Sequence, residues 1–88
     1  MAPMEEQRGA AAEQRERRMR ALRRQVERVE ALLRTTSFTD KQRRRLIDDA
    51  REACQRLCPD KLDLFDRVFA PRFDRAIQDY RKSHPDAS

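Results

Sequence analysis

The chain has 88 residues, of which 38% are hydrophobic and 42% are charged, and its 21 basic and 16 acidic residues give a formal net charge of +5. This length allows one domain with a small core, to which a partner or a second copy would add stability. A single glycine excludes glycine-rich phosphate loops and most hairpin turns, so we expect an all-α protein.

The N-terminal part of the chain contains most of the excess positive charge. Residues 1–11 include Pro3 and Gly9 and show no apolar period, which predicts a flexible tail. Residues 12–34 contain neither glycine nor proline and are mostly good helix formers, so they predict a long, arginine-rich first helix.

One side of this first helix has an apolar repeat with 3-4-3-4 spacing. Such spacing is typical of a coiled-coil seam that lies against another helix. The seam covers little more than two heptads, and extending it backward brings Arg15 to the core side. A parallel homodimer would also place Arg18 near Arg23 of the second copy. We therefore expect the seam to meet a helix of this chain or of another protein; it consists of Met19, Leu22, Val26, Val29 and Leu33.

A second helix is predicted over residues 40–57. Thr39 and Gln42 have the spacing of a capping box, which marks its start. Apolar residues recur along one face, as in an amphipathic helix that faces a core. That face contains Leu46, Ile47, Ala50, Ala53, Cys54 and Leu57.

A third helix is predicted over residues 60–82, after Pro59 stops the second. Its apolar residues keep one helical phase across Pro71, so we expect a kinked continuous helix in which the kink frees the carbonyl of Arg67. Leu64 and Val68 lie outside the main stripe, and residues 83–88 predict a flexible C-terminal tail.

These elements predict a small three-helix bundle or helical hairpin, formed by a single domain over residues 12–82. It would have a long, basic N-terminal helix and a proline-kinked third helix. The expected core consists of Leu22, Val26, Val29, Leu33, Phe38, Leu46, Ile47, Ala50, Cys54, Leu57, Leu62, Phe65, Phe69, Phe73, Ile77 and Tyr80.

The inventory of reactive groups argues against an enzyme. Cys54, Cys58 and the distant His84 are too few ligands for a zinc site, and no nucleophile elbow, P-loop or dinucleotide fingerprint occurs. We expect no metal, no cofactor and no small-molecule substrate. A redox role for the two cysteines stays open, because basic residues such as Arg56 and Lys61 would favour thiolates.

The compartment is predicted from what the sequence lacks. No apolar run approaches the roughly 20 residues that cross a bilayer, and the first residues lack the apolar segment of a secretory signal. We expect no membrane insertion and a soluble, intracellular protein, either cytoplasmic or, in a eukaryote, nuclear.

The first functional hypothesis is a protein-protein interaction module. A short seam, surplus apolar surface on the third helix and the lack of catalytic groups favour an adaptor or accessory subunit that docks an amphipathic helical surface onto a partner. The partner would be another protein or a second copy of the chain. The predicted contact residues are Met19, Leu22, Leu64 and Val68.

The competing hypothesis is a small nucleic-acid-binding regulator. Four arginines project from one side of the first helix, opposite the seam, and a basic run in the second helix would extend this stripe. A solvated helix face explains the same pattern, and aromatic residues that would stack on bases are absent from the stripe. The predicted contacts are Arg17, Arg20, Arg24, Arg28, Arg43, Arg44 and Arg45.

Overall fold

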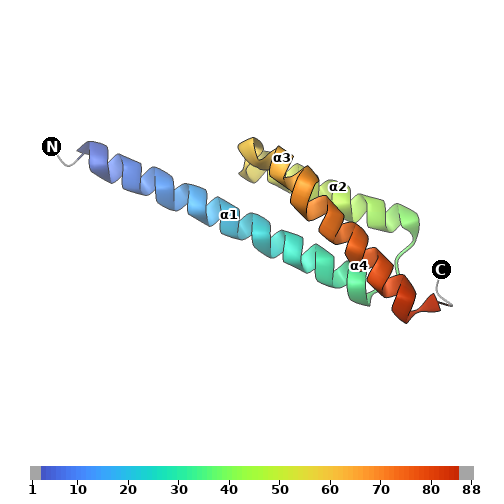
Figure 1. Ribbon diagram of the computed structural model, residues 1–88. Coiled ribbons are helices and arrows are strands. Elements are labelled where there is room, and N and C mark those ends of the chain that lie inside the picture. The colour runs from blue at the N-terminus through green and yellow to red at the C-terminus, as the bar shows by residue number, and fades with distance from the viewer. Residues whose placement is uncertain (1–2, 86–88) are drawn as a thin grey trace.

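The computed structural model describes residues 3–85, with side chains from residue 9 onward. Within that range the chain forms three helical rods in an up-down-up arrangement, and the first rod projects far beyond the other two (Figure 1). This confirms the expected all-α fold. The elements are α1 (Pro3–Thr35), α2 (Asp40–Leu57), a 3₁₀ turn (Pro59–Lys61), α3 (Leu62–Leu64), a π turn (Phe65–Phe69) and α4 (Ala70–Ser83).

The first helix is longer than the sequence predicted. It begins at Pro3 instead of Ala12, so the residues from 3 to 11 are helical and do not form the expected tail. Proline is well tolerated in a first helical turn, and the three alanines after Gly9 offset the weak helix propensity of the glycine. At about 1.5 Å per residue, the helix is roughly 50 Å long.

The length of α1 gives the molecule its elongated shape. Its principal extents are 65 × 18 × 17 Å, and its radius of gyration is 16.7 Å, whereas a compact domain of this size would have about 12 Å. The C-terminal half of α1 packs against both α2 and α4. The N-terminal half extends past the bundle, and every described residue from Gly9 to Arg18 is exposed.

The start of α2 is fixed by the predicted capping box. The backbone N–H of Gln42 donates to Thr39 Oγ1 at 3.1 Å, and the backbone N–H of Thr39 donates to Gln42 Oε1 at 2.9 Å. The short connection over residues 36–39 reverses the chain, so that α2 runs back along α1 (Figure 1).

The third rod consists of α3, the π turn and α4. It is continuous and kinked, as predicted, and the π turn accommodates Pro71. The backbone N–H of Ala70 bonds to the carbonyl of Phe65, five residues earlier, instead of to the carbonyl four residues earlier. This wider turn makes room for a proline ring that would clash in a regular α-helix. The rod also starts differently from the prediction, because a 3₁₀ turn occupies residues 59–61 and Asp60 makes no side-chain cap.

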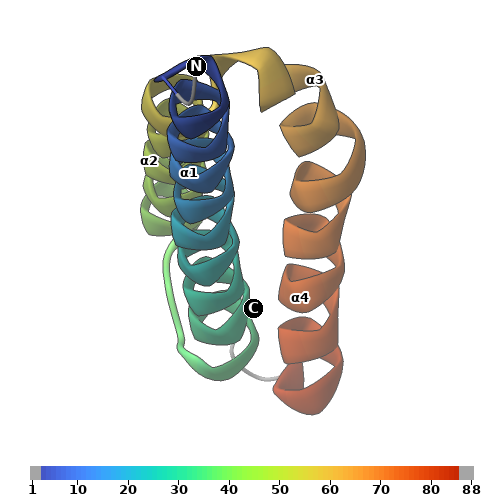
Figure 2. The ribbon, with the colours of Figure 1, turned by 90° about the vertical axis from the view of Figure 1, so that its left-hand side faces the viewer.

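The core is formed where α1 faces the other two rods (Figure 2). In this core α2 contributes small side chains, whereas the third rod contributes phenylalanines that stack edge to face. The ring centroid of Phe65 lies 6.0 Å from that of Phe69 and 5.9 Å from that of Phe73. Small and large groups therefore complement each other across the interface. The buried residues are Leu22, Val26, Val29, Leu33, Ala50, Ala53, Cys54, Cys58, Phe65, Phe69, Phe73, Ala76 and Tyr80.

This set differs from the expected core at its edges. Ala53, Cys58 and Ala76 are buried although the predicted core omitted them. Several larger residues of the predicted core are only half-buried and cover its rim. These are Phe38, Leu46, Ile47, Leu57, Leu62 and Ile77.

Polar contacts set the position of α4 on α1. Arg72 Nη2 donates to Glu30 Oε2 at 2.6 Å, and the guanidinium of Arg72 also lies 5.9 Å from the ring centroid of Phe69. Glu30 accepts a second contact from Arg34, at 3.3 Å. The Glu30 carboxylate thus pairs with one arginine of its own helix and one of α4, and it connects the two helices.

The end of α4 is packed where the sequence predicted a flexible tail. Ser83 is the last helical residue, and the ring of His84 stacks on Tyr80 with centroids 4.3 Å apart. The tail prediction for residues 86–88 lies outside the described residues.

Candidate functional site

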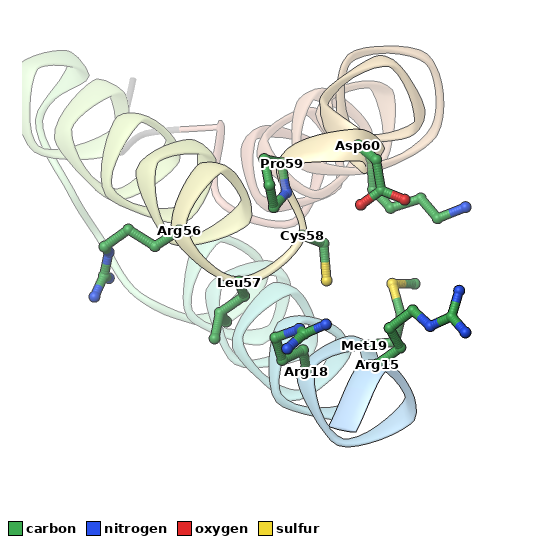
Figure 3. A pocket seen from close by; sticks show the side chains of 9 residues that line it. Arg15, Arg18, Met19, Arg56, Leu57, Cys58, Pro59 and Asp60 are labelled. Carbon is green, nitrogen blue, oxygen red and sulfur yellow. The ribbon is translucent and has the colours of Figure 1, made fainter. Parts of the chain in front are cut away.

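A groove of about 460 Å³ lies where α1 leaves the bundle. One wall is α1, and the other is the C-terminal end of α2 with the 3₁₀ turn that follows it (Figure 3). We call it the junction groove. Its floor is mostly apolar and its rim is mostly cationic. It is lined by Arg15, Arg18, Met19, Arg56, Leu57, Cys58, Pro59, Asp60 and Lys61.

The cations of the junction groove are not neutralised. Among the side chains of residues 9–85, no carboxylate lies within ion-pair distance of Arg15, Arg18 or Lys61. Figure 3 shows the Arg15 and Arg18 side chains near Met19, facing the Cys58 end of α2, whereas Arg56 points away. Asp60 is the one acid among the lining residues. The groove therefore presents an excess of positive charge around an apolar floor.

The thiols near this groove are buried, and the pKa of each is raised above its ordinary value. Burial is the main cause that raises the pKa of Cys58; Asp60 adds to the rise, and Arg18 and Lys61 oppose it. Burial likewise raises the pKa of Cys54, and nearby Cys58 adds to the effect. The expectation that basic neighbours favour thiolates is therefore wrong, because desolvation outweighs their attraction. Within the described part of the chain, no group of three potential metal ligands comes together.

The four predicted partner-binding residues fall into three environments. Leu22 has no exposed surface, so it belongs to the core and cannot contact a partner on the folded bundle. Met19 is half-buried in the junction groove, and Leu64 is half-buried on α3. Val68 is 42% exposed and is the one large hydrophobic residue exposed among those described.

The arginine stripe of α1 is exposed, but only part of it faces a groove. Arg20 pairs with Glu16 at 3.5 Å, one turn away, while Arg17 stands exposed on the projecting segment. Arg24 and Arg28 line a groove of about 660 Å³ between α1 and α2, which also contains Asp49.

The basic run of α2 does not act as a single extension of that stripe. Arg45 lines a smaller groove that shares Leu46 and Asp49 with the groove of Arg24 and Arg28. Arg43 is buried and bonds to Asp40 at 2.8 Å, and Arg44 lines a different groove beside Ile77 of α4. Three consecutive helical residues span about 200° around the helix axis, so they cannot share one face. The structure thus brings together Arg24, Arg28 and Arg45 and separates Arg43 and Arg44.

The sequence hypotheses missed the junction groove itself. Its floor is made when Pro59 turns the chain away from α2, which places Cys58 against α1, and spacing within one helix does not predict that contact. A signal was nevertheless present. The seam, extended backward from Met19, puts Arg15 on the core side, and the structure places Arg15 in this groove.

Comparison of the chain with family models, with curated proteins and with solved structures finds no match. Among the described residues, every helix is too short or too polar to span a membrane.

Proposed function

We propose that this protein is a small helical interaction module, an adaptor or accessory subunit without chemistry of its own. The observation that supports this most directly is apolar surface at the end of the bundle from which α1 projects. Val68 is exposed there, and Leu64 and Met19 are only half-buried. An exposed apolar side chain together with partly buried ones, near an exposed helix, is consistent with a docking surface.

The elongated shape is consistent with such a role. A helix that projects from a bundle exposes side chains on all sides to a partner, and it gains little stability from packing within its own domain. A partner helix that lies along the projecting half of α1 would also meet the bundle end.

The test is a comparison of partner capture by the full-length chain and its variants. Val68→Glu, alone and combined with Leu64→Glu, places charge on the apolar strip formed by Leu64 and Val68. Neither substitution alters a fully buried side chain. We expect a protein that co-purifies from the native cell with the unaltered chain to be lost from both variants. Retention of every co-purifying protein by both would contradict the proposal.

The matched control adds the same charges elsewhere. Gln55→Glu and Gln78→Glu alter exposed polar residues of α2 and α4, and the partner should stay bound to this pair. Circular dichroism of all variants separates loss of contact from loss of fold.

A second candidate function, nucleic-acid binding, is favoured by one observation. Arg24, Arg28 and Arg45 border neighbouring grooves on the side where α1 meets α2, and none has an ion-pair partner among the described side chains. Asp49 lies in both grooves and opposes an incoming phosphate, so this candidate ranks second.

A titration with duplex DNA and with structured RNA at two salt concentrations tests the second candidate. Each phosphate contact that is lost should lower the salt dependence by about one unit of slope. Changing Arg24, Arg28 and Arg45 to glutamine should then reduce both affinity and slope. An affinity that depends neither on salt nor on these three substitutions would exclude nucleic-acid binding through these arginines.

A further inference from the structure

The junction groove has a property that restricts what can fill it. The seam of α1 continues past the bundle, and the position before Met19 on that side is occupied by Arg15. Inside the bundle the same face presents the buried side chains of Leu22 and Val26. An apolar helix that continued the packing along α1 would therefore bury a guanidinium without a partner, and such burial is costly.

We propose that the junction groove binds an acidic amphipathic helix of a partner protein. The apolar side of that helix would cover Met19, Leu57 and Pro59, and its carboxylates would pair with Arg15, Arg18 and Lys61. This inference rests on the proposed role as an interaction module and names the chemistry of the partner.

Charge complementarity is the first argument for this occupant. Elsewhere some cations are paired with acids of the chain, as for Arg51 with Asp66 and Arg72 with Glu30, and others, such as Arg75, are not. In the groove, three cations converge with no such pair, and the one lining acid is Asp60. A planar guanidinium suits bidentate contact with a carboxylate.

The apolar floor is the second argument, and it favours a protein over a nucleic acid. A phosphate backbone gains nothing from contact with Met19, Leu57 and Pro59, whereas leucine-like side chains of an amphipathic helix would be desolvated there.

The geometry of the two walls is the third argument. The α2 helix ends at Leu57, the 3₁₀ turn follows it, and the described residues of α1 before Met19 are all exposed, so α1 projects beyond the other rods (Figure 1). A helix placed end to end with α2 would continue its packing along α1 and begin in the junction groove.

The experiment uses the full-length chain and a labelled synthetic peptide of three heptads, with leucine at the a and d positions and glutamate at e and g. Fluorescence anisotropy should show saturable binding. Two control peptides, with glutamine in place of glutamate or serine in place of leucine, should each bind at least about tenfold more weakly, because the groove requires both charge and apolar contact.

Variants of the protein locate the site. Arg15→Glu combined with Arg18→Glu should weaken binding of the acidic peptide at least about tenfold, since attraction becomes repulsion. These residues lie on an exposed stretch of α1, so the fold should persist. Arg75→Glu, at an exposed and unpaired position on α4, is the matched control and should leave binding within about twofold.

Several results would overturn the inference. These are no saturable binding of the acidic peptide, equal binding of the glutamine peptide, or equal loss from Arg75→Glu. Displacement of the peptide by a 20-base-pair duplex, with tighter binding of that duplex to the same arginines, would assign the groove to nucleic acid. Self-association in sedimentation that the Arg15 and Arg18 changes abolish would assign it to a second copy. None of these results would affect the partner-capture test of the Leu64 and Val68 strip.

Discussion

The two halves of α1 differ in almost every physical respect, although they form one helix. From Leu22 onward, the helix buries its apolar face against α2 and α4, and Glu30 and Arg34 form ion pairs with α4. From Gly9 to Arg18, every described residue is exposed. The change occurs at Met19, beside the junction groove.

This contrast indicates how stability and recognition are distributed in the chain. The bundle half gains its free energy of folding from buried aromatic and aliphatic side chains, which a short helix in water cannot supply for itself. The projecting half contributes little to that core. Its sequence is therefore free to present charge, and three unpaired cations line the groove where the two halves meet.

The largest expected effect on stability comes from creating a cavity in the core of the bundle. Phe73 has no exposed surface and stacks against Phe65, so Phe73→Ala should lower the free energy of unfolding by about 3–5 kcal/mol. In a domain this small, that loss removes much of the total stability. Denaturant unfolding followed by circular dichroism measures it.

Val68→Ala is the control for that substitution. It shortens an exposed side chain of the same rod and should change stability by less than about 0.5 kcal/mol. A small effect of Phe73→Ala would show that the bundle half lacks the tight core on which the comparison depends.

A smaller effect is expected from the ion pair that connects α4 to α1. Arg72→Gln removes the 2.6 Å contact with Glu30 and the contact with the ring of Phe69. Because Arg34 still pairs with Glu30, we expect a loss of only about 1 kcal/mol. Arg67→Gln, which breaks an exposed pair with Asp63 within one rod, should have less effect in the same assay.

Periodicity predicted most of this fold for a physical reason. The apolar faces of helices that pack on one another must repeat near 3.6 residues, so the seam of α1, the stripe of α2 and the phase of the third rod could all be read from the chain. The capping box at Thr39 is local and was equally visible. The π turn was not predicted, because the four-residue spacings from Phe65 to Phe69 and from Phe69 to Phe73 are also compatible with a regular α-helix.

The candidate site was harder to predict because it is formed by tertiary contact. Leu22 has the same apolar spacing as Met19, yet one is buried and the other borders the junction groove. Only the point at which α2 ends decides between them. Likewise, Arg43 and Arg44 line one groove beside Ile77, whereas the next residue, Arg45, lines another.

The exposed pair between α2 and the third rod predicts a dependence on pH. Both oxygens of Asp66 accept from Arg51, at 3.1 and 3.2 Å, and this hydrogen bonding is the main cause that lowers the pKa of Asp66. A carboxylate with a lowered pKa stabilises the fold above about pH 4 and loses that contribution as the pH falls through its folded value.

Asp66→Asn tests this dependence. The variant should be slightly less stable than the unaltered chain at about pH 6. The difference should shrink as the pH falls and Asp66 becomes protonated, because a neutral carboxyl and an amide carry the same charge. Urea unfolding at a series of pH values measures the difference. A gap that widened with acid would show that the pair does not stabilise the bundle through the charged carboxylate.

The smallest expected effect is the most direct test of the division between the two halves. Removal of residues 1–14 deletes much of the projecting segment but leaves Arg15, Met19 and every buried side chain in place. Because the deleted part packs against no other rod in the described structure, the free energy of unfolding of the bundle should change by less than about 0.5 kcal/mol, while the helical signal per molecule falls. A large loss of stability would mean that the projecting half supports the core through contacts that exposure alone does not reveal, and α1 would then have to be treated as one unit in both folding and recognition.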